Sequence, residues 1–416
     1  MGALAAVMML LAAGVLAAGA VGVKRVLAEP PAPTVEIHTA ATLTPVLAAG
    51  RPVAAPAQGS LALVATGPHL ARTPVVEQQA STVRQIGSVA KVMTALVTLE
   101  SRPLAVGESG PGYTMDATDV SYYTGDLAAG GSVVPVSRGE VFTERQLLLA
   151  LLLPSGNNIA ETLARWVGGT RSAFVSSLNA RARALGMAHT TFADPSGFDD
   201  GTVSTADDLV ILGAAALAVP ALADVVKTTG ATLPDGTSIT NLDSLLTTEP
   251  GWLGIKTGST NAAGGCLLFA ASRPATGAAA GDAAHSVTLV GAVLGQPQLQ
   301  DAITAAAAVV NSAAAEFAVV DPARLRPDVT GSVNASWGAA TTVTLGQGAT
   351  GDLLVLRAGQ TLALSTSTRR LSTPVASGTR VGTVTATLDG TAVATWPVVT
   401  TATVEGPGLG WRLENN

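Results

Sequence analysis

The stretch Arg84–Glu100, RQIGSVAKVMTALVTLE, contains the features that decide the fold. Val92 and Leu96 recur at helical spacing and predict a helix that buries one apolar face. Ser88 and Lys91 stand three residues apart at its start, so their side chains fall on one face about a turn apart. We therefore expect a core helix that presents a hydroxyl beside an amine.

Two further short motifs follow Ser88-Val89-Ala90-Lys91 along the chain. They are Ser155-Gly156-Asn157 and Lys256-Thr257-Gly258. The chain has only four lysines. Random placement of four lysines would produce an S-x-x-K motif about 0.3 times and a K-T-G motif fewer than about 0.1 times. The ordered set S-x-x-K, S-x-N, K-T-G is typical of serine enzymes that act on D-alanyl peptides or β-lactams.

The residue types of the first motif suit nucleophilic catalysis. A serine hydroxyl is a poor nucleophile at its ordinary pKa and needs a base within hydrogen-bond reach. Lys91 can serve as that base for Ser88 if burial and the nearby cation of Lys256 lower its pKa. A Ser-Lys pair needs no histidine. The four histidines all lie outside the motifs: His38, His69, His189 and His285.

The other two motifs have complementary roles in this arrangement. We expect Ser155 to pass a proton between Lys91 and the leaving amine, and Asn157 to hold the peptide group of the substrate. Lys256 and Thr257 would receive the terminal carboxylate of the substrate.

Backbone groups complete the expected site. Gly258 lets its strand approach the ligand closely. The backbone N–H groups of Ser88 and Ser259 are the expected oxyanion hole, which stabilises the transition state by a few kcal/mol per donor.

The sequence favours no metal site and no cofactor. Five aspartates gather between residues 194 and 208, but their spacing does not fit a calcium loop. Ser204 or Thr205, ahead of Asp207 and Asp208, favours helix capping instead. Cys266 is the only cysteine, which excludes an intrachain disulfide and favours a buried apolar role.

Charge and hydropathy bear on the partners and the location of the protein. The net charge is −6 and no basic run occurs, so a nucleic-acid partner is not expected. Residues 2–23 carry no charged side chain and predict a signal peptide or an N-terminal membrane anchor. Lys24 and Arg25 after this stretch argue weakly against export. We nevertheless expect export, because the chemistry above needs a substrate outside the cytoplasm.

The order of elements predicts an α+β fold. Strands are expected at 60–66, 251–260, 265–272 and 286–294, with helices between the first two and another at 301–317. From residue 321 short alternating stretches predict a small all-β domain, with a hairpin at Asp389-Gly390. The expected domains are 1–28, signal peptide or anchor; 29–57, Pro/Ala-rich spacer; 58–320, motif-bearing domain; 321–405, β-sandwich-like domain; and 406–416, tail.

The sequence resembles the D-alanyl-D-alanine carboxypeptidases of serine peptidase family S11, the low-molecular-weight penicillin-binding proteins. The resemblance rests on the three motifs and on the segments 84–100, 142–161, 185–209, 254–271 and 374–399. It implies a β-lactamase/transpeptidase-like domain, with helices packed around an antiparallel sheet, followed by the β-domain. It also implies an acyl-enzyme on Ser88 that releases the terminal D-Ala of peptidoglycan stem pentapeptides. The implied partners are stem peptides, β-lactam antibiotics as covalent inhibitors, and a membrane bound through the N-terminal segment.

Some residues depart from the family pattern. Ser259 and Val203 stand where members often have histidine. Members commonly carry an arginine, thought to hold the substrate carboxylate, after the strand that corresponds to Ser286–Leu294. This chain has Gly295–Gln300, GQPQLQ, in that place.

Two alternatives stay open: a D,D-endopeptidase of the same family, and a wall-binding pseudoenzyme with weak turnover. A class A β-lactamase is disfavoured, because it needs a deacylating glutamate and none occurs between Glu161 and Glu249.

Overall fold

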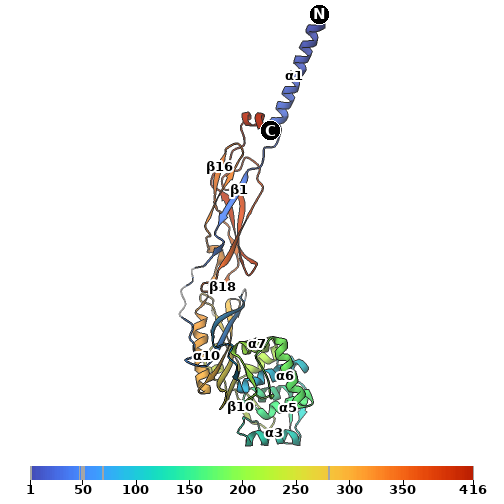
Figure 1. The fold of residues 1–416 in the computed structure, drawn as a ribbon, viewed down its shortest axis with the longest axis vertical. Coiled ribbons are helices and arrows are strands. Elements are labelled where there is room, and N and C mark those ends of the chain that lie inside the picture. The colour runs from blue at the N-terminus through green and yellow to red at the C-terminus, as the bar shows by residue number, and fades with distance from the viewer. Residues whose placement is uncertain (1, 46, 48–51, 68–69, 280–281, 416) are drawn as a thin grey trace. The chain divides into compact units, whose positions relative to one another are not determined.

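The computed structural model describes residues 2–45, 47, 52–67, 70–279 and 282–415 (Figure 1). The chain forms two compact units. One comprises Ala48–Val319 with Val355–Ala358 and contains the three motifs; we call it the motif unit. The other, which we call the β unit, comprises Met1–Leu47, Val320–Leu354 and Gly359–Asn416.

A five-stranded antiparallel sheet organises the motif unit. Its strand order is β11-β12-β13-β3-β4. The strands are β3 (Ser60–Gly67), β4 (Leu70–Gln78), β11 (Trp252–Thr260), β12 (Gly264–Pro274) and β13 (Ser286–Gln296). The four strands expected from the sequence are thereby confirmed, and β4 is an additional one. The strand that carries Lys256 lies at one edge of the sheet, where one side of its backbone is open.

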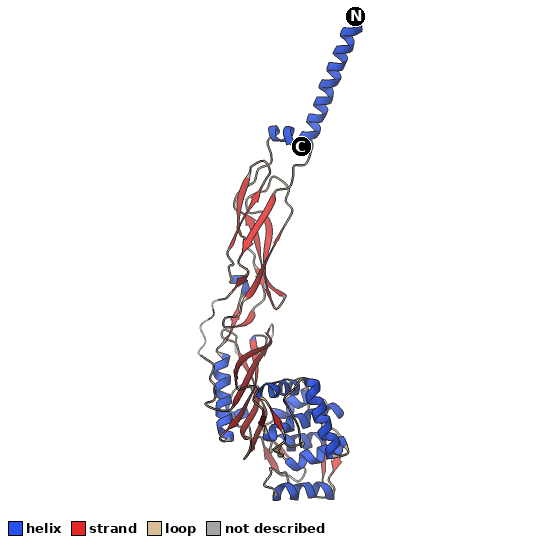
Figure 2. Ribbon diagram, in the orientation of Figure 1, coloured by secondary structure: helices blue, strands red, loops and turns tan. Residues whose placement is uncertain are grey.

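Both faces of this sheet are covered by helices (Figure 2). Successive side chains of a strand point to opposite faces. Leu267 and Phe269 of β12 accordingly pack in a cluster with α10 (Leu299–Ala314). Leu268 and Ala270 belong to the larger cluster formed with the remaining helices. The unbroken apolar run of β12 therefore reflects a strand that is buried on both sides.

The larger helical layer contains seven helices of the described chain and a short 3₁₀ turn. They are η1 (Gly87–Ala90), α2 (Lys91–Ser101), α3 (Ala117–Ala128), α4 (Glu144–Leu152), α5 (Asn157–Gly168), α6 (Arg171–Leu185), α7 (Ala206–Leu217) and α8 (Pro220–Val226). Short strand pairs connect them: β5 (Arg84–Gln85) with β8 (Val203–Ser204), β6 (Gly112–Thr114) with β7 (Val141–Thr143), and β9 (Gly230–Thr232) with β10 (Ser238–Thr240). The remaining elements are α9 (Leu245–Thr248), η2 (Ala283–His285) and β14 (Phe317–Val320), and the turn η3 (Pro322–Arg324) follows in the β unit.

Helix α2 is buried more completely than its sequence indicates. Every residue from Lys91 to Leu99 is buried, so the expectation of one buried face is wrong. Two buried threonines make this possible because backbone carbonyls accept hydrogen bonds from their hydroxyl groups. Thr94 Oγ1 donates to the Pro195 carbonyl at 2.6 Å, and Thr98 Oγ1 donates to the Thr94 carbonyl at 2.8 Å. The helix that carries Lys91 is thus held rigidly inside the unit.

The β unit is built around an eight-stranded antiparallel sheet. Its main path is β1-β15-β16-β21-β20-β19-β2, and β17 pairs with β21. The strands are β1 (Thr34–Thr39), β2 (Thr42–Leu43), β15 (Val329–Asn334), β16 (Ala340–Leu345), β17 (Thr350–Gly351), β19 (Leu362–Thr368), β20 (Arg380–Leu388) and β21 (Thr391–Thr400). Strand β18 (Leu354–Arg357) pairs instead with β14.

The expected hairpin between β20 and β21 is confirmed. Leu388 pairs with Thr391 across a two-residue loop. Asp389 and Gly390 have φ values of 49° and 79°, as a tight turn with two left-handed residues requires.

The prediction that residues 29–57 form a spacer is wrong for residues 34–43. Strand β1 pairs in full register with β15, from Thr34 opposite Asn334 to Thr39 opposite Val329, and β2 pairs with β19. The short alternating segment TVEIHT, in which Ile37 is buried, was not predicted as a strand because it lies in a stretch rich in proline and alanine. Pairing satisfies the backbone groups that an isolated extended segment would leave to water.

The two ends of the chain form helices of the β unit. Helix α1 (Gly2–Leu27) includes a span, Ala6–Leu27, that is long and apolar enough to cross a membrane. A signal sequence and a membrane anchor share these properties. Helix α11 (Leu409–Asn415) lies in the segment expected to be a tail.

Candidate active site

The candidate nucleophile lies on a tight turn that enters the core helix. Ser88 belongs to η1, so it precedes the α-helix that begins at Lys91. Gly87, just before it, has a φ of +50°, and a Cβ there would lie 3.3 Å from the Ser259 backbone nitrogen. Only glycine combines this left-handed geometry with so close an approach. Ser88 is therefore held against the strand of the third motif while remaining partly exposed.

Lys91 is the centre of the site. Its side chain is fully buried, and its Nζ lies 2.7 Å from Ser88 Oγ, 2.7 Å from Asn157 Oδ1 and 3.0 Å from the Ser196 carbonyl oxygen. Burial lowers the pKa of Lys91 well below its ordinary value, and the charge of Lys256 lowers it further. The carboxylates of Asp194 and Asp126 act in the opposite direction. The first two motifs therefore meet at one amine.

The second motif begins where α4 ends. Ser155 has a φ of +68°, a left-handed conformation unusual for serine, and its buried Oγ has no hydrogen-bond partner among the described residues. Asn157 then opens α5. The next side chain fixes this corner, because Asn158 accepts from the Val134 N–H at 3.0 Å and donates to the Val134 carbonyl at 2.8 Å. A strained, unpaired hydroxyl inside a rigid corner is typical of a functional group.

The third motif lies on the exposed edge of the sheet, in β11. Lys256 is almost fully buried and donates to Thr257 Oγ1 at 3.3 Å. Burial lowers the pKa of Lys256 to about 7, although Asp243 raises it. A Cβ on Gly258 would lie 2.7 Å from the Ile86 carbonyl oxygen, which explains why glycine stands there. The strand backbone can therefore lie directly against the turn that carries Ser88.

One part of the site that the motifs do not indicate lies around Asp194, an aspartate for which the sequence favours a structural role over metal binding. Its buried carboxylate accepts hydrogen bonds from a short loop: from the N–H of Ser196 (3.1 Å), Gly197 (3.0 Å) and Phe198 (3.0 Å), and from the hydroxyls of Ser196 (2.5 Å) and Thr202 (2.6 Å). This loop points the Ser196 carbonyl at Lys91. A usable signal was the sequence Asp-Pro-Ser-Gly, because an aspartate readily accepts from the next few backbone N–H groups.

The remaining predicted features have local roles. Thr205 caps α7 by accepting from the Asp208 N–H at 3.1 Å, which confirms the capping interpretation. Cys266 is a buried free thiol, and burial raises its pKa to about 11. His69 lies outside the described residues. Within the described ranges no group of three or more His, Cys, Asp or Glu side chains is placed to hold a metal ion.

The motif unit is similar to known proteins. The model of the peptidase S11 family, described as D-alanyl-D-alanine carboxypeptidase, matches residues 73–280, which is half of the chain. The D-alanyl-D-alanine carboxypeptidase DacB2 of Mycobacterium tuberculosis is 38% identical over 192 residues, 45% of this chain and 62% of that protein. A D-alanyl-D-alanine endopeptidase of Pseudomonas aeruginosa is 33% identical over 197 residues, 44% of this chain and 58% of that protein. The chain thus spans about three fifths of the length of these relatives.

A solved structure gives the same result for the fold. The Streptomyces K15 DD-transpeptidase superposes with a TM-score of 0.54 at 27% identity, over 63% of this chain and 99% of that one. The expected α+β, transpeptidase-like fold is confirmed. The chain belongs to the S11 family of D-alanyl-D-alanine carboxypeptidases.

Proposed function

We propose that this protein is a serine-type D-Ala-D-Ala carboxypeptidase that removes the terminal D-Ala from peptidoglycan stem pentapeptides. The observation that carries the proposal is the hydrogen-bonding of Lys91, whose Nζ lies 2.7 Å from Ser88 Oγ inside the protein. A neutral amine has two N–H donors and one lone pair. Asn157 Oδ1 and the Ser196 carbonyl can only accept, so they take both N–H groups. The lone pair then faces the Ser88 hydroxyl.

This arrangement supports a general-base mechanism. Lys91 accepts the proton of Ser88 as Oγ attacks the carbonyl of the penultimate D-Ala. The backbone N–H groups of Ser88 and Ser259 stabilise the oxyanion that forms. Ser155, whose hydroxyl is otherwise unpaired, carries the proton from Lys91 to the leaving D-Ala nitrogen. Water then hydrolyses the acyl-enzyme with Lys91 again as the base.

The edge strand binds the substrate in this proposal. The terminal carboxylate lies at Lys256 and Thr257, where a cation and a hydroxyl are adjacent. A bound carboxylate favours the charged form of Lys256 and keeps it a cation during catalysis. That cation in turn keeps the pKa of Lys91 low. Penicillins present a carboxylate and a reactive amide with similar spacing, so we expect them to acylate Ser88 as covalent inhibitors.

The first experiment compares the full-length protein in detergent with its Ser88→Ala variant. A fluorescent penicillin reports acylation, and D-Ala release from diacetyl-Lys-D-Ala-D-Ala reports turnover. We expect both signals in the wild type and neither in Ser88→Ala. Ser177→Ala, an exposed position on α6, is the matched control and should retain both. Acylation without D-Ala release would support the wall-binding pseudoenzyme, and loss of neither signal in Ser88→Ala would refute the proposal.

A D,D-endopeptidase is the second candidate, because an endopeptidase is among the similar proteins. The two activities use the same nucleophile and differ in the group beyond the scissile bond. Incubation with a cross-linked muropeptide dimer separates them. Conversion to monomers faster than D-Ala release from the pentapeptide would favour the endopeptidase.

We also propose that the protein works outside the cytoplasm and stays attached to the membrane through α1. Contacts between the two ends of the chain support retention of this helix. Arg412 Nη1 donates to the carbonyls of Val26 (2.9 Å) and Ala28 (3.3 Å), and Arg25 Nη1 donates to the Leu413 carbonyl at 2.7 Å. Cleavage at residue 28 would remove these partners of α11. N-terminal sequencing of the protein from membranes tests this; a mature chain that begins near residue 29 would contradict it.

A further inference from the structure

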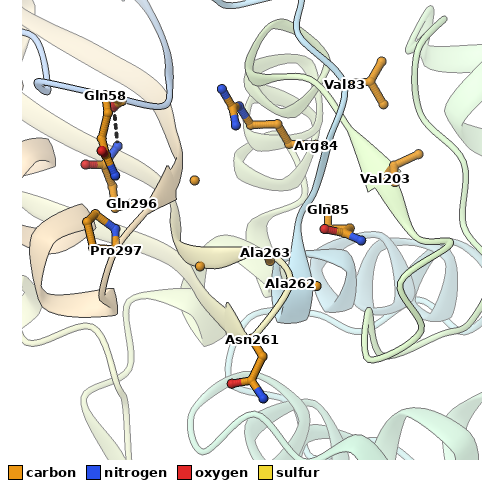
Figure 3. Close-up of a pocket in the computed structure, with 12 residues that line it drawn as sticks. Gln58, Val83, Arg84, Gln85, Val203, Asn261, Ala262, Ala263, Gln296 and Pro297 are labelled. Atoms are coloured by element: carbon orange, nitrogen blue, oxygen red, sulfur yellow. Dashed lines mark hydrogen bonds between the residues drawn. The ribbon is translucent and has the colours of Figure 1, made fainter.

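A second polar pocket adjoins the candidate active site. It has a volume of about 540 Å³ and lies where β5, the β11–β12 turn and the end of β13 meet (Figure 3). Figure 3 shows Arg84, Gln85, Asn261 and Gln296 around it. None of the three motifs contributes a residue to its lining. Gln85 is nevertheless only three residues before Ser88, and Asn261 only two after Ser259.

The described lining of the pocket carries a positive charge and no carboxylate. Among the described residues that line it, Arg84 alone is charged, and the other polar side chains are amides. Arg84 Nε donates to Ser60 Oγ at 2.8 Å and Nη2 donates to Gln79 Oε1 at 3.0 Å. These neutral acceptors fix the guanidinium and leave Nη1 beside Gly295, a residue of the pocket wall. A guanidinium held in this way is suited to bind a carboxylate.

The segment that lacks the family's arginine forms one wall of this pocket. Gln296 and Pro297 line it, and the Gln296 amide donates to the Gln58 carbonyl at 2.7 Å (Figure 3). Because the Gln296 side chain is directed toward Gln58, it does not fill the pocket beside Arg84. The charge of this region therefore comes from β5 and not from the segment after β13.

The proposed direction of the substrate leads toward the pocket. Its terminal carboxylate lies at Lys256 and Thr257, and its scissile carbonyl lies at Ser259, so the peptide runs along β11 in the direction of increasing residue number. Each strand residue advances about 3.3 Å. Asn261 is thus about 7 Å beyond the scissile carbonyl, the length of two extended residues. The peptide segment before the penultimate D-Ala therefore comes to the side of the pocket that Asn261 lines.

We propose that this pocket is a subsite for a free carboxylate upstream of the scissile bond, with Arg84 as its binding group. The inference rests on the proposed function for the direction of the peptide. In a stem peptide such a carboxylate belongs either to the side chain of the diamino acid or to the γ-linked glutamyl residue before it. Amidation of that carboxylate would remove the charge that Arg84 binds.

The experiment uses pairs of pentapeptides that differ only by carboxylate or carboxamide, one pair modified at the diamino acid and one at the glutamyl residue. We expect the wild type to prefer the carboxylate by about tenfold in kcat/KM in one of the pairs, as expected for one charge-assisted hydrogen bond. Arg84→Gln should reduce this ratio to about one, and added salt should shrink it. The ratio is informative because a general structural defect lowers kcat/KM equally for both peptides of a pair.

An exposed position on the rim provides a matched test of charge. Ala262 is exposed and lines the pocket. Ala262→Glu should abolish or invert the carboxylate preference, whereas Ala262→Lys should retain or increase it. Equal ratios in all variants, or no preference in the wild type in either pair, would overturn the proposal.

Binding of the same peptides to the Ser88→Ala protein, measured by calorimetry, separates this inference from the proposed function. If no peptide is hydrolysed by the wild type, the carboxypeptidase proposal fails. A tenfold difference in Kd between paired peptides that disappears in Ser88→Ala/Arg84→Gln would still support the subsite, and equal Kd values would exclude it.

Discussion

Replacement of Asn157 by aspartate tests the role of Lys91 as a base with little change in shape. The new carboxylate oxygen would stand 2.7 Å from Lys91 Nζ. Coulomb's law at an effective dielectric constant of about 20 gives an attraction of about 6 kcal/mol at this distance. The Asn157 amide oxygen already accepts a hydrogen bond from Lys91, and burial raises the pKa of the new carboxyl, so only part of this attraction appears as a change in the pKa of Lys91. The net effect is a rise of roughly 2 units in the pKa of Lys91, at 1.36 kcal/mol per unit.

The direction of the effect on activity follows from which form of Lys91 reacts. Only the neutral amine accepts the Ser88 proton, so the acylation rate rises with pH through the pKa of Lys91. Asn157→Asp should move this acid limb upward by about 2 pH units. At a pH on the limb of both proteins the acylation rate should fall about a hundredfold, and it should recover at high pH. The measurement is the second-order rate of acylation by a fluorescent penicillin between pH 5.5 and 10.

Asn157→Ala is the control with the opposite sign. It removes an acceptor that stabilises the ammonium form, so the pKa of Lys91 falls and the acid limb moves to lower pH. Opposite shifts of the limb in the two variants would identify Lys91 as the group that titrates. An unshifted limb in Asn157→Asp would refute the reasoning, whatever the absolute rates.

Three further predictions concern stability and geometry. Burial raises the pKa of Glu144 to about 7, and its oxygens have no hydrogen-bond partner among the described residues. The folded state therefore binds this proton more tightly than the unfolded state, and stability falls as pH rises from about 4.5 toward 7. Glu144→Gln should raise the free energy of unfolding in urea at pH 8 by roughly 1 kcal/mol after allowance for solvent screening, and little at pH 4.5; an unchanged pH dependence would contradict this. Ser155→Gly should slow acylation yet raise the melting temperature slightly, because relief of a left-handed serine gains roughly 1 kcal/mol; Ser155→Ala, which keeps the strain, should show no such gain. Gly258→Ala would press a methyl group on the Ile86 carbonyl and should slow acylation by about a hundredfold or more in a protein that still unfolds cooperatively; a rate within a few-fold of the wild type would show that the strand can move away.

The sequence predicted the parts of the molecule that local patterns encode. The apolar runs of β12 and β13, the proline after α4 and the Asp-Gly hairpin specify their elements through burial and backbone geometry alone. The three motifs identified the amines and hydroxyls that the structure brings to one place. Asp-Pro-Ser-Gly could have indicated the turn at Asp194, but not that the Ser196 carbonyl accepts from Lys91, because that contact joins segments about 100 residues apart. The position of the Arg84 guanidinium in the pocket could not be predicted either, since it depends on three strands that are distant in sequence.

The pairing of β1 with β15 determines when each unit can fold. Residues 34–39 belong to a sheet whose other strands, apart from β2, begin at residue 329, so nearly 290 residues separate β1 from its partner β15. The motif unit lies between them in the chain, apart from Val355–Ala358. Synthesis proceeds from the N-terminus. The last strand of the main sheet of the motif unit is complete at residue 296, before β15, the partner of β1, has been made. We therefore expect the motif unit to fold first, while β1 remains an unpaired strand. During that interval β1 is the segment most open to mispairing with another chain.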